Sequence, residues 1–257
     1  MPVAYAADGA VGTITLDRPP ANSYDLAFVR ELGEVVEEAA GDDEARVVVV
    51  RSASEKFFSA GADVKAFRDN PHETNMEMIE ASHATLRLIA SFPKVFVAEI
   101  AGHALGGGLE IALACDLRCG AEGDYRIGTP EVTLGLLPGN GGTQRLTRLV
   151  GWSRALDLMV TGRTLTPQEA YDLGILNRLF PAEEAAARTR ELAETLAGGA
   201  TKAIANIKLA VHEGVDDGLD RGLARERELV EELFLSADGR EGLAAFAEKR
   251  RPQFTGA

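Results

Sequence analysis

The stretch AGHALGGGLEIALACD, residues 101–116, joins three consecutive glycines to an apolar segment that contains one early charge, Glu110. The residues just before the glycines, KVFVAEIAG (94–102), have the β-branched and aromatic content of a strand, and those from Leu109 onward favour a helix. The glycines therefore predict a tight turn from a strand into a helix. Because the first N–H groups of a helix have no partner within it, this turn can bind an anion or an oxyanion.

This pattern also has a purely structural interpretation. Glycines allow a strand and a helix to pack closely, and an acidic residue in the first turn of a helix is favoured by the helix dipole. The stretch alone leaves both interpretations open for Gly106, Gly107, Gly108 and Glu110.

The composition narrows the class of protein. The chain has 257 residues, with 27 basic and 40 acidic side chains and a formal net charge of −13, which disfavours a general nucleic-acid or anionic-membrane surface. Its two cysteines, Cys115 and Cys119, fit a reduced chain better than a disulfide framework. The N-terminal residues lack a signal-peptide pattern and no apolar run reaches about 18 residues, so we expect a cytoplasmic protein.

Strand and helix patterns alternate up to about residue 182, which predicts an α/β fold. Strands are predicted at 11–17, 46–53, 94–102 and around 115–119, and a helix over 26–40. After residue 182 only amphipathic helices are predicted, over 183–197, 201–214 and 219–234. We therefore divide the chain into a core, residues 1–195, and a helical region, residues 196–257. The helical region has an apolar face that either folds back on the core or meets another subunit. This face contains Leu219, Leu223, Val230, Leu233 and Phe234.

Two further segments extend the pattern seen at the three glycines. KFFSAGADVKAF (56–67) follows a predicted strand with a tight Ala-Gly-Ala turn, and N–H donors from two such loops can form an oxyanion hole. GTPEVTLGLLPGNGG (128–142) places Glu131 in apolar surroundings ahead of a second glycine cluster. Glu110 and Glu131 are too far apart in the chain to share a helical face, but they could converge across one pocket as an acid and a base.

Five segments, in this order, resemble the enoyl-CoA hydratase/isomerase superfamily, also called the crotonase superfamily, and the resemblance spans essentially the whole chain. The segments are FSAGADVK (58–65), AGHALGGGLEIALACDL (101–117), PEVTLGLLPGNGGTQRLTRLVG (130–151), TGRTLTPQEAYDLGIL (161–176) and EGLAAFAEKRRPQF (241–254). The resemblance implies a spiral of ββα turns with a C-terminal helical region that mediates oligomerisation and covers the active site. It also implies a homotrimer or hexamer and a coenzyme A thioester as substrate.

The resemblance assigns roles to individual positions. The N–H groups of Ala62 and Gly107 would form the oxyanion hole for the thioester oxygen, Glu110 and Glu131 would be the two catalytic glutamates, and the N–H of Gly139 would position water. Contacts with coenzyme A would come from Ala60, Ala62, Asp63, Val64 and Lys65, and from Lys249 of a neighbouring subunit.

The predicted reaction is hydration of trans-2-enoyl-CoA to 3-hydroxyacyl-CoA, a step of fatty-acid β-oxidation. We expect no metal and no separate cofactor, because two glutamates and two amides suffice and coenzyme A is part of the substrate. The histidines show no metal-ligand spacing and are given surface or core roles: they are His72, His83, His103 and His212. Isomerisation, decarboxylation or hydrolysis on the same scaffold is the alternative, and a non-catalytic acyl-CoA-binding protein is the least favoured.

The sequence departs from the family pattern at three places. DRPPANSYDL (17–26) is shorter than the corresponding family segment and adds Tyr24 and Asp25, so the way coenzyme A enters there is left undecided. Asn140 is a polar variation beside the proposed water position, where it either tunes the chemistry or caps the next helix. The segment over 67–86 varies most in the family and leaves the acyl chain length open. Its apolar residues would either line the acyl pocket or belong to the core: they are Met76, Met78 and Ile79.

Overall fold

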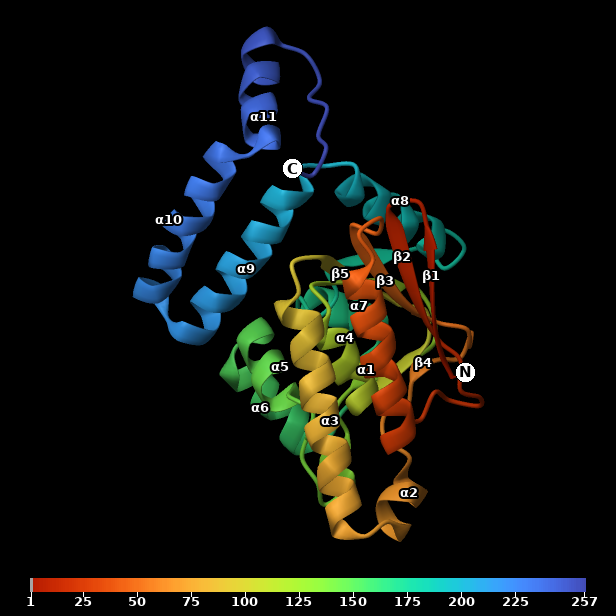
Figure 1. Ribbon diagram of the computed structural model, residues 1–257. Helices are drawn as coiled ribbons and strands as arrows, with labels where there is room; N and C mark the ends of the chain where they lie inside the picture. The colour runs from red at the N-terminus through yellow and green to blue at the C-terminus, as the bar shows by residue number, and fades with distance from the viewer. Residues whose placement is uncertain (1) are drawn as a thin grey trace.

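A computed structural model describes residues 2–257, which form two neighbouring sheets surrounded by helices (Figure 1). The strands are β1 (Val3–Asp8), β2 (Val11–Leu16), β3 (Val47–Ser52), β4 (Phe57–Ser59), β5 (Val95–Ile100), β6 (His103–Leu105), β7 (Leu117–Ala121), β8 (Ile127–Gly128) and β9 (Arg178–Phe180). The helices are α1 (Leu26–Gly41), α2 (Val64–Asp69), α3 (His72–Ser91), α4 (Gly107–Ala114), the 3-10 helix η1 (Glu131–Leu134), α5 (Gly142–Val150), α6 (Trp152–Thr161), α7 (Pro167–Asp172), α8 (Ala185–Ala197), α9 (Thr201–Asp217), α10 (Leu219–Leu235) and α11 (Ala237–Glu248).

The larger sheet is buried on both faces, as the sequence of β3 requires. Its order is β1-β2-β3-β5-β7-β9, and every pair after the β1–β2 hairpin is parallel. Val48 and Val50 of β3 point into the main core with α1 and α4, whereas Val47 and Val49 face a second core beneath α8. A continuous valine run is the sequence expected for a parallel strand covered on two sides.

The chain forms a spiral by sending alternate strands to alternate sheets. β3, β5 and β7 lie in the larger sheet, and the strand after each of them lies in the smaller sheet, which has the order β4-β6-β8. Helices follow each pair of strands. The predicted α/β spiral of ββα turns is therefore confirmed. Because β4, β6 and β8 are adjacent and parallel, the residues that follow these three strands lie at the same edge of the smaller sheet.

The predicted elements agree with the structure except where local signals were weak. The four predicted strands correspond to β2, β3, β5 and β7, and the predicted helices to α1, α8, α9 and α10. Strand β1 and the 20-residue helix α3 were not predicted. The boundary predicted between residues 195 and 196 falls inside α8, which packs on β3, β5 and β7. The division into two regions stays a prediction.

The C-terminal helices α9, α10 and α11 extend away from the sheets (Figure 1). α9 is anchored by Lys208, whose Nζ lies 2.9 Å from Asp116 Oδ2 and donates to the carbonyl oxygens of Ile89 and Lys94. The apolar face predicted for this region does not fold back, because Leu219 is 75% exposed and Phe234 is 66% exposed. None of the helices in the described chain is long and apolar enough to cross a membrane.

This exposed apolar face leads us to expect a homotrimer or hexamer in solution. Light scattering across a range of concentrations should give a mass of three or six chains. Phe246→Asp should lower that mass, because Phe246 on α11 is 86% exposed and a carboxylate there opposes apolar association. A stable monomer with full activity would contradict this expectation.

Candidate active site

Two glycine turns meet at the centre of the molecule. Gly61 follows β4 with a φ of +85°, a conformation that favours glycine. A Cβ at Gly61 would lie 2.8 Å from the carbonyl oxygen of Leu105 and 3.0 Å from the amide nitrogen of Gly107. The turn that contains Ala62 therefore packs directly on the turn that starts α4.

The amides of Ala62 and Gly107 are both available at this contact. The residues beside Ala62 are engaged, because Tyr24 N donates to Gly61 O at 3.0 Å and Asp63 N donates to Tyr24 O at 2.8 Å. Gly107 begins α4, so its N–H has no acceptor within that helix. Among the backbone hydrogen bonds of turns, loops and caps in residues 2–257, neither the N–H of Ala62 nor that of Gly107 is a donor. Two neighbouring donors are thus free for one ligand oxygen.

Glu110 is buried, with 1% of its surface exposed, and it is held by the start of another helix. Its Oε1 accepts hydrogen bonds from Asn140 N at 2.7 Å and from Gly142 N at 2.6 Å. Gly142 is the first residue of α5, and a Cβ there would lie 2.9 Å from the same oxygen. Burial raises the pKa of Glu110, while these two amides and the charge of Arg145 act in the opposite direction.

Glu131 lies beside the first glycine turn and near Glu110. It is half-buried in η1, and a Cβ at Gly106 would lie 3.1 Å from its Oε1. Its Oε2 is buried and has no partner within residues 2–257. Burial raises the pKa of Glu131 to about 7, its own backbone N–H lowers it, and the charge of Glu110 raises it. The site therefore contains one carboxyl group held by two amides and one that is partly protonated near neutral pH.

Gly139 has a partner that the sequence did not reveal. The Nε2 atom of His83 on α3 lies 2.6 Å from the carbonyl oxygen of Gly139. Sequence analysis gave His83 a surface or core role, and no local pattern links it to a loop 56 residues further along. This contact joins α3 to the residue whose N–H was predicted to position water.

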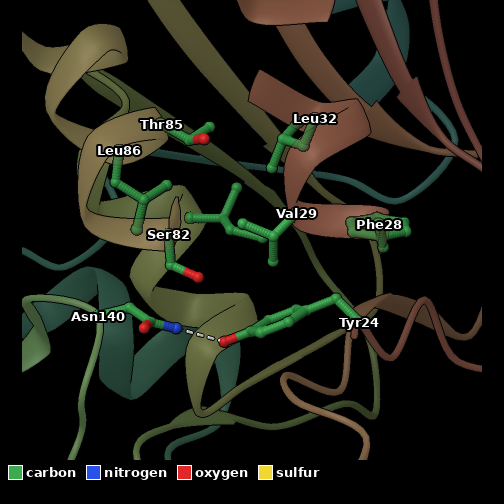
Figure 2. Close-up of a pocket in the computed structure, with 9 residues that line it drawn as sticks. Tyr24, Phe28, Val29, Leu32, Ser82, Thr85, Leu86 and Asn140 are labelled. Carbon is green, nitrogen blue, oxygen red and sulfur yellow. Dashed lines mark hydrogen bonds between the residues drawn. The ribbon is translucent and has the colours of Figure 1, made fainter. Parts of the chain in front are cut away.

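Tyr24 and Asn140, two positions at which the sequence departs from the family pattern, are in contact in the structure. Asn140 Nδ2 donates to Tyr24 Oη, and Figure 2 shows the two side chains pointing toward each other below residues of α1 and α3. The interpretation of Asn140 as a helix cap is wrong. Gly141 is the N-cap of α5, and the Asn140 side chain turns toward Tyr24 instead. The ring of Tyr24 stacks on Phe28 with centroids 6.3 Å apart.

The methionine positions divide between surface and core. Met78 is 1% exposed and belongs to the main core, so it does not line an acyl pocket. Met76 is 44% exposed. Ile79 approaches the site, because its Cδ1 would lie 3.3 Å from a Cβ at Gly139.

The positions predicted to contact coenzyme A lie in two separate places within one chain. Val64 and Lys65 are exposed at the start of α2, next to the half-buried Ala60 and Ala62. Asp63 caps that helix, with Oδ1 accepting from the amides of Lys65 and Ala66. The other position, Lys249, is exposed at the end of α11, at the opposite end of the molecule from α2 (Figure 1). One chain alone does not bring Lys249 to the α2 group.

The spiral fold and its paired glycine turns define the class of protein. Residues 6–257 match the family model described as "Enoyl-CoA hydratase/isomerase". The chain belongs to this family, whose substrates are coenzyme A thioesters.

Individual relatives match over almost their whole length. The "Probable enoyl-CoA hydratase echA8" of Mycobacterium tuberculosis is 38% identical over 250 residues, covering 96% of this chain and 95% of that protein. The "Enoyl-CoA isomerase/hydratase fer4" of Mycosarcoma maydis is 37% identical over 251 residues, covering 95% and 92%. The crystal structure of an enoyl-CoA hydratase from Geobacillus kaustophilus HTA426 superposes with a TM-score of 0.97 at 45% identity, covering 100% of this chain and 97% of that one.

The tight contact at Gly107 leads to a test of the site geometry. A Cβ at Gly107 would lie 1.6 Å from Tyr24 Oη, so Gly107→Ala must displace the tyrosine or the start of α4. We expect a loss of about 1–3 kcal/mol in the free energy of unfolding, together with loss of activity. Urea denaturation of the purified variant measures the first effect.

Gly41→Ala is the matched control. Gly41 ends α1, and nothing lies within 4 Å of a Cβ placed there. This variant should be neutral or slightly more stable, because alanine favours the helix. Equal stability of the two variants would show that Gly107 is not packed as described.

Proposed function

We propose that the protein hydrates trans-2-enoyl-CoA thioesters to 3-hydroxyacyl-CoA. The observation that supports this most is the pairing of Glu110 and Glu131 around one glycine turn, with opposite hydrogen-bonding environments. Hydration needs a base for the water and an acid for C2, and a single group does not provide both at once.

The thioester oxygen accepts hydrogen bonds from the N–H groups of Ala62 and Gly107. As water adds to C3, negative charge collects on this oxygen. Two fixed donors at the N-terminus of α4 stabilise that charge more than they stabilise the ground state. The turns around Gly61 and Gly106 hold the donors in place.

The two glutamates move the protons. Glu110 accepts a proton from the water as the new C3–O bond forms, and the N–H of Gly139 orients that water. The π electrons of the C2–C3 double bond form a C2–H bond with the proton of Glu131. The proton on Glu110 then returns to Glu131 through solvent, which restores the starting state. These transfers call for no metal and no separate cofactor.

Coenzyme A enters as part of the substrate. We assign its nucleotide end to residues at and just before the start of α2, where Val64 and Lys65 are exposed: Ala60, Ala62, Asp63, Val64 and Lys65. Lys249 of the partner subunit completes this contact in an oligomer, because α2 and α11 lie at opposite ends of the molecule within one chain. Localisation in the cytoplasm is part of the same proposal.

The alternative is double-bond isomerisation on the same scaffold, which the name of the fer4 relative supports. A single carboxylate can shuttle a proton between two carbons, so an isomerase would need one of the two glutamates only. Decarboxylation and hydrolysis use the same oxyanion hole, and acyl-CoA binding without catalysis is the least favoured alternative.

The two-glutamate mechanism predicts the effect of removing either carboxylate. Glu110→Gln and Glu131→Gln should each lower kcat for crotonyl-CoA by about 10²- to 10⁴-fold, because each loses a proton acceptor or donor at nearly constant volume. The double variant should lose less than the product of the two. The loss of conjugated-thioester absorbance measures the rate.

Glu99→Gln is the matched control. Glu99 is also a glutamate with a pKa raised by burial, but it alternates with the core residues Ala98 and Ile100 and so faces the opposite side of β5. It should keep near wild-type kcat. If one catalytic substitution is silent on a 3-enoyl-CoA while the other abolishes turnover, the isomerase alternative is correct. Losses below tenfold for both, in folded protein, contradict the two-glutamate mechanism.

The pKa of Glu131 predicts the pH dependence. An acid must hold its proton before it can donate it, so the active form is present below about pH 7 and is lost as the pH rises through that value. kcat/KM for crotonyl-CoA should therefore fall about tenfold per pH unit above neutrality. The residual activity of Glu131→Gln should not show this fall above neutral pH. A flat profile from pH 6 to 9 for the wild type would contradict the assignment of Glu131 as the acid.

A further inference from the structure

The hydroxyl group of Tyr24 lies directly against the start of α4. A Cβ at Gly107 would lie 1.6 Å from Tyr24 Oη and 2.6 Å from Tyr24 Cζ. The hydroxyl therefore contacts the first residue of α4, where a side chain at position 107 would otherwise lie.

The backbone of Tyr24 is tied to the other donor loop. Tyr24 pairs with Ala62 as an isolated parallel bridge, with hydrogen bonds to Gly61 on one side and Asp63 on the other. One residue thus touches both turns that present free amides. Its hydroxyl is placed relative to Ala62 by the backbone and relative to Gly107 by packing.

The hydrogen bond from Asn140 leaves the tyrosine proton unused. Asn140 Nδ2 is the donor and Tyr24 Oη the acceptor, so the O–H of Tyr24 can still donate. Within residues 2–257 this O–H donates no hydrogen bond, and the neighbouring Asn140 Oδ1 is itself buried without a partner. Tyr24 is only 2% exposed and Asn140 is 5% exposed, so a free donor there is costly in the absence of a ligand.

Tyr24 also keeps its proton at neutral pH. Burial raises its pKa far above the ordinary value, and the charges of Glu110 and Glu131 raise it further, which outweighs the opposing effect of Asn140. A buried hydroxyl that stays protonated beside two free amides is suited to donate to developing negative charge.

We propose that Tyr24 is a third donor of the oxyanion hole, with its O–H donating to the thioester oxygen beside the amides of Ala62 and Gly107. The side chain of Asn140 orients that hydroxyl and is a positioning residue. This inference rests on the proposed acyl-CoA site, but not on which reaction follows there. It gives one explanation for two of the departures from the family pattern, Tyr24 and Asn140.

The direct test is infrared spectroscopy of butyryl-CoA with a ¹³C-labelled thioester carbonyl, bound to wild type and to Tyr24→Phe. Hydrogen-bond donors weaken the C=O bond and lower its stretching frequency. The variant keeps the ring but lacks the O–H, so the bound carbonyl should absorb at a higher frequency than in wild type. In parallel, kcat for crotonyl-CoA should fall on the order of 10²-fold with little change in KM, as for loss of one oxyanion donor.

Two further variants separate this role from packing. Tyr5→Phe removes a hydroxyl bonded to Asp42, just beyond the C-terminal end of α1, whereas Tyr24 precedes its N-terminal end. The helix has 16 residues and is about 24 Å long, so this variant should match wild type in frequency and kcat. Asn140→Ala keeps its backbone N–H on Glu110 and should shift the frequency in the same direction as Tyr24→Phe, by less.

The outcomes are distinct. An upward carbonyl shift in Tyr24→Phe and none in Tyr5→Phe supports the proposal. An unchanged frequency in Tyr24→Phe overturns it, even if kcat falls, because the hydroxyl would then be structural. If the wild type fails to hydrate crotonyl-CoA, the proposed function is wrong, while the spectrum of bound butyryl-CoA still decides whether Tyr24 contacts the oxygen.

Discussion

The buried carboxylate of Glu110, held at the start of α5, is the constraint on which the site depends. An isolated charge with 1% of its surface exposed would be strongly unfavourable, and the amides of Asn140 and Gly142 compensate for the lost water. This hydrogen bonding requires a residue without a side chain at Gly142 and a helix that begins there. Gly142 at the start of α5 is therefore needed to hold Glu110 of α4.

Burial also governs the ionisable groups around Glu110. Burial, together with the nearby charge of Glu110, raises the pKa of Glu131 to about 7, so the environments of the two carboxyl groups differ. Burial, together with the charges of Glu110 and Glu131, raises the pKa of Tyr24, so a protonated hydroxyl group lies against the start of α4. The loop just before α5 is held by two further contacts. His83 contacts the carbonyl oxygen of Gly139, and Arg145 donates to the carbonyl oxygen of Asn140.

The parts of this arrangement that could be predicted from sequence are those with local signals. Valine runs, glycine turns after strands and glutamates in apolar segments each indicate their structure within about ten residues, and five such segments in order indicate the family. The contacts of Tyr24 with Asn140 and of His83 with Gly139 join positions 116 and 56 residues apart, and no periodicity links them. Met78 was ambiguous because helical spacing alone does not distinguish a core side chain from a pocket side chain.

The central claim is that water adds across the double bond, and isotope incorporation tests it most directly. Crotonyl-CoA is incubated with the wild-type protein in D₂O enriched in ¹⁸O, and the acyl product is analysed by mass spectrometry. The account predicts a 3-hydroxybutyryl thioester with one ¹⁸O at C3 and one deuterium at C2. Deuterium without ¹⁸O, or ¹⁸O found only in a released carboxylate, would contradict it.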